Sequence, residues 1–207
     1  MIATVDVVNA YVLAGGKSTR MGQDKAFLRF GACTLLESAV ELARGAAGNA
    51  RIVGSTAKFA AFGPVVEDVY PECGPLGGVH AALSGTTANL NLVVAVDLPF
   101  IRLDFLKYLI VRARQSNDAV VVPRASGRLQ PLCAVYQRSF AEVAERSLRA
   151  GKYKIDSLFT EVSTMVIGPE ELEQEGFSEE MFRNLNTPED WEEARRRASD
   201  FGSRTSG

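Results

Sequence analysis

The chain has 207 residues, of which 46% are hydrophobic, and its formal net charge is −2. This composition supports one sizeable core and excludes a broad basic face for nucleic acid or anionic membrane surfaces. No apolar run reaches the length of about 18 residues that a spanning helix needs, and the first residues do not resemble a signal peptide, so we expect a soluble, cytoplasmic protein. We expect a single domain over residues 5–197 and a disordered tail over residues 198–207.

Apolar runs typical of strands alternate along the chain with amphipathic segments typical of helices. The expected strands are Val5–Leu13, Arg51–Val53, Leu90–Val96, Ala119–Val122, Leu132–Tyr136 and Thr164–Ile167. The expected helices are Thr34–Ala47, Phe105–Arg114, Phe140–Arg149 and Pro188–Arg197, with Asp104 capping the second and Thr187 or Asp190 the last. This alternation predicts an α/β fold with a single doubly wound, mostly parallel sheet that is covered by helices on both faces, as in Rossmann-like proteins.

A glycine-rich and basic segment, Leu13–Lys25, follows the first expected strand. Gly15 and Gly16 have no Cβ, so the backbone there can approach a ligand closely and turn its N–H groups toward anionic oxygens. Three side chains then add full positive charges: Lys17, Arg20 and Lys25. Because open α/β sheets bind ligands at the carboxyl ends of their strands, the segment predicts a binding site for nucleotide phosphates.

Two better-known phosphate motifs do not fit this segment. Gly16-Lys17-Ser18 copies the end of a Walker A loop, but Tyr11 stands where that motif needs a glycine. The dinucleotide motif of three closely spaced glycines also fails, since the next glycine after Gly16 is Gly22. The segment therefore belongs to a different class of nucleotide site.

A second glycine-rich stretch lies between Asp68 and the small-residue helix that we expect after Gly78. Gly77 and Gly78 would allow close backbone approach there, and a helix start offers unpaired N–H groups. The alternative is a purely structural turn. We expect Asp68, which follows a short strand, to contact the ligand.

Asp97 ends the most apolar of the expected strands and is followed by Leu98 and Pro99. It could simply cap that turn, but neighbouring parallel strands would bring it beside the glycine-rich segment. A carboxylate next to a triphosphate needs a bridging cation, and Mg²⁺ takes few protein carboxylates and completes its coordination with phosphates and water. The pattern therefore predicts that Asp97 is a Mg²⁺ ligand.

The cysteines and the histidine carry no comparable signal. Cys33, Cys73 and Cys133 are odd in number and widely spaced, which favours free thiols over disulfides or a metal site. His80 is the only histidine, and no Gly-x-Ser-x-Gly motif accompanies it, so we expect it to be structural.

Taken in order, several motifs resemble those of one family. They are Leu13-Ala-Gly-Gly, Arg20-Met-Gly, Asp24-Lys25, Gly74-Pro-Leu-Gly-Gly, Asp97-Leu-Pro, Gln130-Pro-Leu with Tyr136, and Asn184-Leu-Asn-Thr-Pro-Glu-Asp190. The chain is similar to molybdenum cofactor guanylyltransferases, which are nucleotidyltransferases of the sugar-nucleotide type. The first motif alone would indicate only the wider class, whereas the ordered set over nearly the whole chain is much more specific.

The resemblance implies roles for individual residues. Leu13, Ala14 and Gly15 would lie against the guanine and ribose of GTP, and Gly16 is associated with guanine rather than cytosine. Lys25 and Arg20 would contact the phosphates, Asp68 the nucleotide, and Asp97 both GTP and Mg²⁺. Gln130, Asn184 and Asn186 would line the pterin site. Where some relatives have a nucleotide-binding asparagine after the second strand, this chain has Val53-Gly54-Ser55.

The resemblance also implies the reaction. The terminal phosphate of molybdenum-loaded molybdopterin would attack the α-phosphorus of GTP, giving the guanine dinucleotide cofactor and pyrophosphate, with transient contacts to proteins that deliver or receive the cofactor. Because a phosphate monoester is already an anion at neutral pH, no strong general base is required. Lys25, Arg20 and Asp97 with its Mg²⁺ would act by prepositioned positive charge. The alternatives are a cytidylyltransferase or sugar-phosphate nucleotidyltransferase and, from another class, a noncatalytic nucleotide-binding module.

Overall fold

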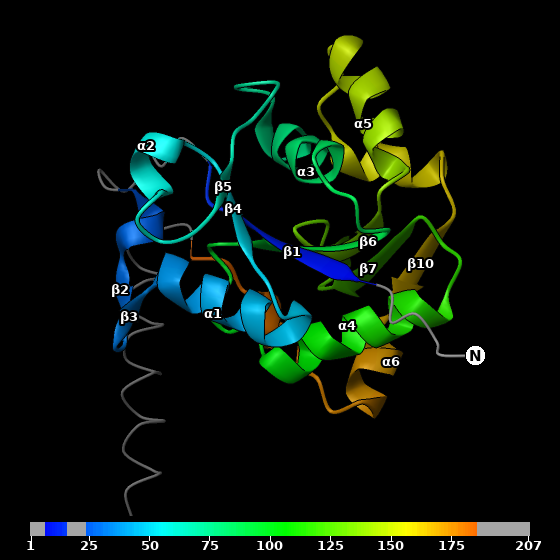
Figure 1. Ribbon diagram of the computed structural model, residues 1–207. Coiled ribbons are helices and arrows are strands. Elements are labelled where there is room, and N and C mark those ends of the chain that lie inside the picture. Colours follow the sequence, from blue (N-terminus) through cyan, green and yellow to red (C-terminus); the bar gives the residue numbers. More distant parts are fainter. Residues whose placement is uncertain (1–6, 16–23, 186–207) are drawn as a thin grey trace, which may run out of the picture.

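A computed structural model describes residues 7–15 and 24–185, and its described strands form one large sheet and one small hairpin (Figure 1). The large sheet has the order β10-β7-β9-β6-β1-β4-β5, with β8 paired to β7. Its strands are β1 (Val8–Leu13), β4 (Arg51–Val53), β5 (Val65–Val66), β6 (Leu90–Ala95), β7 (Val120–Ala125), β8 (Arg128–Leu129), β9 (Cys133–Gln137) and β10 (Thr164–Ile167). The hairpin consists of β2 (Arg29–Phe30) and β3 (Cys33–Thr34).

The sheet is mostly parallel, as the sequence predicts. The pairs β1·β4, β1·β6, β4·β5 and β7·β10 are parallel, and β9 runs antiparallel between β6 and β7. Because β9 is reversed, its amino-terminal end lies at the carboxyl end of β6, where Ala95 N donates to Leu132 O at 2.7 Å. That reversal brings the segment before β9 to the edge of the sheet where the parallel strands end.

Helices cover both faces of the sheet, which confirms the doubly wound class (Figure 1). They are α1 (Leu35–Ala47), α2 (Thr56–Phe59), α3 (Gly74–Ser84), α4 (Leu103–Gln115), α5 (Phe140–Arg149) and α6 (Pro169–Gln174), with the 3₁₀ turns η1 (Lys25–Phe27), η2 (Ile155–Thr160) and η3 (Glu179–Phe182). In Figure 1, α3 and α5 lie over one face and α1, α4 and α6 over the other. No helix among the described ranges is long and apolar enough to span a membrane.

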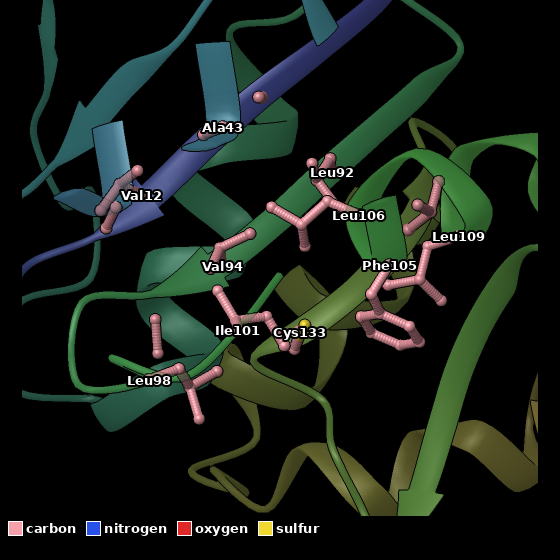
Figure 2. Packing of buried hydrophobic residues seen from close by; sticks show 14 of the residues in the cluster. Val12, Ala43, Leu92, Val94, Leu98, Ile101, Phe105, Leu106, Leu109 and Cys133 are labelled. Carbon is pink, nitrogen blue, oxygen red and sulfur yellow. The ribbon is translucent and has the colours of Figure 1, made fainter. Parts of the chain in front are cut away.

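Alternate side chains of each central strand enter two different cores. In β1, Val12 belongs to the cluster that also holds Ala43 of α1 and Leu106 of α4 (Figure 2), whereas Tyr11 and Leu13 belong to the cluster under α3 and α5. The period of two follows from the pleat of the strand. All six residues of β6 are buried, which is why five of them are apolar without alternation. The sixth is Asn91, whose Nδ2 donates to Ala88 O at 3.1 Å.

Most of the expected elements within the described residues are correct to within one to three residues. The expected Thr164–Ile167, Arg51–Val53 and Phe140–Arg149 match β10, β4 and α5. β7 continues three residues past the expected end, because its last residues pair with β8 in a hairpin. Several expectations fall outside the described residues. They are the start of the expected domain and of its first strand at residue 5, the helix Pro188–Arg197 with its caps, and the tail.

The expected cap of α4 is wrong. The N-cap is Arg102, and Asp104 is the second residue of the helix, where its Oδ1 accepts from Phe105 N at 2.9 Å. Asp104 also pairs with Arg102. An acid in the first turn is still favourable, since it faces the positive end of the helix dipole. In α1 the sequence signal is complete, because Thr34 and Glu37 form a reciprocal capping box.

Candidate functional site

The carboxyl ends of β4, β1 and β6 meet at one edge of the sheet. β1 and β6 stay paired up to Leu13 and Ala95, and Val96 N then donates to Leu13 O at 3.1 Å. On the other side of β1, both Ala14 N and Gly15 N donate to Val53 O, at 3.0 and 3.2 Å. The start of the glycine-rich segment, Leu13–Gly15, and Asp97 are therefore neighbours, as expected from two adjacent parallel strands.

These hydrogen bonds also correct one expectation. The Gly15 N–H does not point toward a ligand, because it donates to Val53 O. The chain continues to pair with the end of β4 for two residues after β1 ends at Leu13. Of the glycine pair, only Gly15 is described; Gly16, Lys17 and Arg20 lie outside the described residues. Among the described residues of the segment Leu13–Lys25, the one that places a positive charge at this edge is Lys25.

Lys25 and Asp97 face each other across this edge, with Lys25 Nζ 3.8 Å from Asp97 Oδ2. Their side chains are 18% and 24% exposed. Burial raises the pKa of Asp97, and the positive charge of Lys25 opposes that rise. A mostly buried carboxylate that is only partly compensated by one lysine is well suited to hold a further cation.

The turn η1 fixes the position of Lys25. Asp24 caps the turn, since its Oδ1 accepts from Ala26 N at 3.2 Å, and Ala26 is fully buried. The Phe27 ring packs against those of Phe59 and Phe62, with ring centroids at 5.8 and 5.7 Å. The lysine is thus anchored by the residues on both sides of it in the chain.

Three adjoining cavities follow the edge of the sheet. The central cavity, about 230 Å³, is lined by residues that include Gly15, Asp24, Lys25, Pro75 and Asp97. It shares Gly15, Asp24 and Pro75 with a cavity of about 780 Å³, the glycine-side cavity. It shares Asp97 with a cavity of about 650 Å³ on the other side, the hairpin-side cavity. The Lys25–Asp97 pair therefore lies between two larger spaces.

The glycine-side cavity has an acidic lining. The charged residues that line it are Asp24, Lys58, Glu67, Asp68 and Glu72. Asp68 Oδ2 lies 3.8 Å from the position that a Cβ on Gly15 would take, and burial raises the pKa of Asp68. Carboxylates repel phosphates but accept hydrogen bonds from ribose hydroxyls and base N–H groups, so this cavity suits a nucleoside rather than a triphosphate.

The hairpin-side cavity is lined by charged side chains of both signs, Asp97 and Asp156 as well as two arginines, and by polar residues. The β7–β8 hairpin supplies Arg124 and Arg128, and the segment before β9 supplies Gln130, whose Nε2 donates to Ala125 O and Arg128 O, both at 3.4 Å. Asn184 also lines it, because Leu185 N donates to the backbone oxygen of Asp97 at 3.4 Å. Asn186, the other expected pterin residue, lies outside the described residues.

The expectation for Gly77 and Gly78 is wrong. α3 begins at Gly74, so both glycines lie inside the helix, and Gly74 and Pro75 line the glycine-side cavity instead. A Cβ on Gly77 would lie 2.8 Å from Tyr70 O, and one on Gly78 would lie 3.4 Å from Leu13 Cδ2. These glycines serve close packing of the helix rather than approach of a ligand.

His80 and the cysteines lie where structural residues are expected. His80 is buried in α3, with Nε2 3.0 Å from Ser84 Oγ, and lines none of the three cavities. All three cysteines are free, and burial raises the pKa of the Cys133 thiol. No group of three potential metal-ligating side chains of the His, Cys, Asp and Glu type occurs within residues 7–15 and 24–185.

Sequence reasoning missed the lining residues Lys58, Arg124 and Arg128, and it named Asp24 only as part of a motif, without a role in the site. The two arginines flank Ser126-Gly127, whose φ angles of 50° and 74° form the hairpin turn. A Ser-Gly pair after an apolar run is a turn signal that could have revealed this hairpin. Lys58 had no such signal, because α2 is a single short turn; its Nζ pairs with Asp24 Oδ2 at 3.0 Å.

Gly54 lines the wall of the glycine-side cavity. Its φ is +155°, and a Cβ there would lie 2.8 Å from the Phe59 ring. We expect Gly54→Ala to lower the free energy of unfolding by roughly 1–3 kcal/mol through overpacking, measured by denaturant titration. Gly63→Ala is the matched control, because Gly63 has φ +154° but its nearest contact, Ile52 Cδ1, is 3.9 Å away. Equal losses in both variants would contradict a specific contact with Phe59.

Comparison with known proteins places the chain among nucleotidyltransferases. Residues 10–164 match the family model described as a MobA-like NTP transferase domain. A probable molybdenum cofactor guanylyltransferase of Carboxydothermus hydrogenoformans is 34% identical, over 87% of this chain and 91% of that protein. The protein of the same name from Pelotomaculum thermopropionicum is 36% identical, over 89% and 90%. The crystal structure of molybdopterin-guanine dinucleotide biosynthesis protein A from Archaeoglobus fulgidus has a TM-score of 0.81 and 25% identity, covering 93% of this chain and 99% of that one.

Proposed function

The chain belongs to the family of MobA-like NTP transferase domains, and on that basis we propose that it is a molybdenum cofactor guanylyltransferase. It transfers GMP from GTP to the terminal phosphate of the molybdenum-molybdopterin cofactor and releases pyrophosphate. The observation that carries this proposal is the Lys25–Asp97 pair in a small cavity between two larger ones. A transferase needs this arrangement, since two substrates must meet at one reacting phosphorus.

The charges of the three cavities indicate how the substrates lie. The acidic glycine-side cavity, with Leu13, Ala14 and Gly15 at its border, accepts the guanine and ribose of GTP, and Asp68 contacts the nucleoside there. The phosphates then occupy the central cavity beside Lys25. The hairpin-side cavity, with Gln130 and Asn184, takes the pterin. In this orientation the α-phosphate lies at Asp97, which the central and hairpin-side cavities share.

Asp97 fits a Mg²⁺ ion that binds together with GTP. Mg²⁺ is commonly held by one or two protein carboxylates and takes its remaining ligands from phosphates and water, and the central cavity offers the carboxylates of Asp97 and Asp24. When bound, Mg²⁺ would neutralise phosphate charge and help to orient the reacting groups. Asp97 is the residue that would hold it, because the second oxygen of Asp24 is engaged by Lys58.

The chain's own residues act by charge and position. Lys25 reduces the repulsion between the two anionic substrates and stabilises the charge that grows on the departing pyrophosphate. Arg20 is proposed to add a second positive charge near the phosphates. No side chain has to remove a proton from the acceptor, since its phosphate already carries negative charge at neutral pH. Holding the two phosphates in line in the central cavity supplies the rest of the rate enhancement.

The decisive experiment measures pyrophosphate release by the purified protein with Mg²⁺ and either GTP or CTP, with and without molybdenum-loaded molybdopterin. Release that requires both GTP and the cofactor would establish the proposal. Release with CTP would instead place the protein among cytidylyltransferases. Tight binding of GTP without any release would point to a noncatalytic nucleotide-binding module.

Arg124 and Arg128 of the β7–β8 hairpin line the cavity that we assign to the acceptor, the molybdenum-molybdopterin cofactor. We expect Arg128→Ala to raise the KM for the cofactor about tenfold, because a charge-assisted hydrogen bond to its anionic part is lost, while the KM for GTP stays unchanged. Steady-state kinetics with each substrate varied in turn measures both values. Arg138→Ala is the control, since Arg138 follows β9 at the opposite edge of the sheet. A rise confined to the KM for GTP would show that the cavities are assigned the wrong way round.

A further inference from the structure

The segment that carries Asp68 has no regular secondary structure of its own. Residues 67–73 connect β5 to α3 and are mostly exposed. Asp68 nevertheless lies close to Gly15, with Oδ2 3.8 Å from the position of a Cβ on Gly15. The Asp68 carboxylate can keep a fixed position on an exposed segment only if that segment is attached to a helix or strand nearby.

Tyr70 provides that attachment on α3. Its backbone oxygen lies so close to the helix that a Cβ on Gly77 would be only 2.8 Å from it, and a second contact would be made to Cys73 Cβ at 3.5 Å. Real Cβ atoms are not found at 2.8 Å from a backbone oxygen, so the segment would have to move if Gly77 had a side chain. The Tyr70 ring packs edge-on against His80, one turn further along, with centroids 5.1 Å apart at 73°.

The same tyrosine is also bound to α5. Its hydroxyl donates to Glu145 Oε1 at 3.2 Å and accepts from Arg149 Nε at 3.3 Å, while Arg149 and Glu145 form an ion pair at 2.6 Å. Two helices therefore hold a residue that is only two positions from Asp68. None of Tyr70, Gly77, Glu145 and Arg149 lines one of the three cavities.

We propose that Tyr70 and Gly77 are positioning residues for the nucleotide, because they allow residues 67–73 to pack against α3 and α5. This attachment, which we call the seat, holds Asp68 at the nucleoside end of the site. The inference rests on the proposed function, because it assumes that Asp68 contacts GTP. The absence of a side chain at position 77 is then a requirement for GTP affinity, although the residue itself does not touch the ligand.

Gly77→Ala tests the seat directly. We expect the KM and the Kd for GTP to rise about tenfold, while kcat and the KM for the cofactor stay within about twofold of the wild-type values. Alanine has a higher helix propensity than glycine, so α3 itself is not weakened. Gly85→Ala is the matched control at the C-cap of the same helix, where a Cβ would meet nothing within 4 Å. Equal KM values for GTP in Gly77→Ala and wild type would overturn the proposal.

A double-mutant cycle separates positioning through Asp68 from a general structural role. Asp68→Ala with Gly77→Ala is expected to bind GTP no more weakly than Asp68→Ala alone, because the seat matters only through that carboxylate. Additive losses would overturn the proposal. Tyr70→Phe keeps the ring on His80 but removes the bonds to α5, and we expect it to raise the Kd for GTP about threefold, less than Gly77→Ala does.

Hydrogen exchange keeps this test independent of the enzyme's activity. In nucleotide-free protein, we expect the amides of residues 67–73 to exchange faster in Gly77→Ala and Tyr70→Phe than in wild type or Gly85→Ala. Unchanged exchange in Gly77→Ala would overturn the seat. Failure of the wild-type protein to bind GTP would count against the proposed function, and faster exchange in the variants would still show that the seat exists.

Discussion

Replacing Asp97 with asparagine is expected to lower kcat/KM for GMP transfer by about 100-fold to 1000-fold, the range found when one preorganised electrostatic contact is removed. Asparagine has the same shape but lacks the negative charge that holds a divalent cation among phosphates. The rate of pyrophosphate release, measured over a range of Mg²⁺ concentrations, checks this. We expect the residual activity of Asp97→Asn to need more Mg²⁺ than the wild-type activity does.

The stability of the same variant distinguishes loss of function from loss of fold. Because burial raises the pKa of Asp97, the folded state disfavours its charged form, and a neutral amide removes that cost. The free energy of unfolding of Asp97→Asn is therefore expected to equal or exceed that of the wild type. Asp104→Asn, at an exposed position of α4, is the control and should keep full activity. Near-normal transfer by Asp97→Asn would remove this carboxylate from the mechanism.

Lys25→Ala is expected to have a comparably large effect, a loss of about 100-fold to 1000-fold in kcat/KM. Lys25 is the cation that the structure places beside Asp97 in the central cavity, and its loss leaves the phosphates facing two carboxylates, Asp97 and Asp24. Steady-state rates with saturating cofactor and varied GTP measure the loss. The fold should be retained, since η1 is anchored by Asp24, Ala26 and Phe27 rather than by the lysine.

Lys107→Ala is the matched control for the lysine. Lys107 is exposed on α4 and lines none of the three cavities. Both variants remove one positive charge from the protein, so a general effect of net charge on the binding of anionic substrates would lower both rates alike. Equal, small losses in the two variants would contradict a specific role of Lys25 at the phosphates.

Local sequence patterns predicted the parts of the site that depend on strand ends. Gly15, Asp68 and Asp97 come soon after apolar strands, Lys25 lies in η1 at the end of the segment that follows the first of them, and parallel neighbours end at the same edge of a sheet. The structure brings these four residues to the glycine-side and central cavities, as that rule requires. The apolar character of β6 and the capping box of α1 are likewise properties of a few consecutive residues, so they could be recognised without knowledge of the fold.

Patterns within a glycine-rich stretch were less informative. The sequence suggested that Gly77 and Gly78 lie before a helix and face a ligand, whereas they lie within α3 and face Tyr70 and Leu13. A glycine shows that space is lacking or that the backbone is unusual, but it does not show which partner takes the space. That partner comes from another part of the chain, so it is decided by tertiary packing.

By itself the sequence determined the class of fold, the alternation of strands and helices, and the edge of the sheet at which the chemistry gathers, because these follow from short-range periodicity and from how strands end. Only the tertiary structure decided that β9 is reversed between β6 and β7, which brings Gln130 and the hairpin arginines to the same edge. It also decided that the N–H groups of Ala14 and Gly15 bind Val53 instead of a ligand. Both depend on pairing between distant segments, for which local side-chain patterns carry no signal.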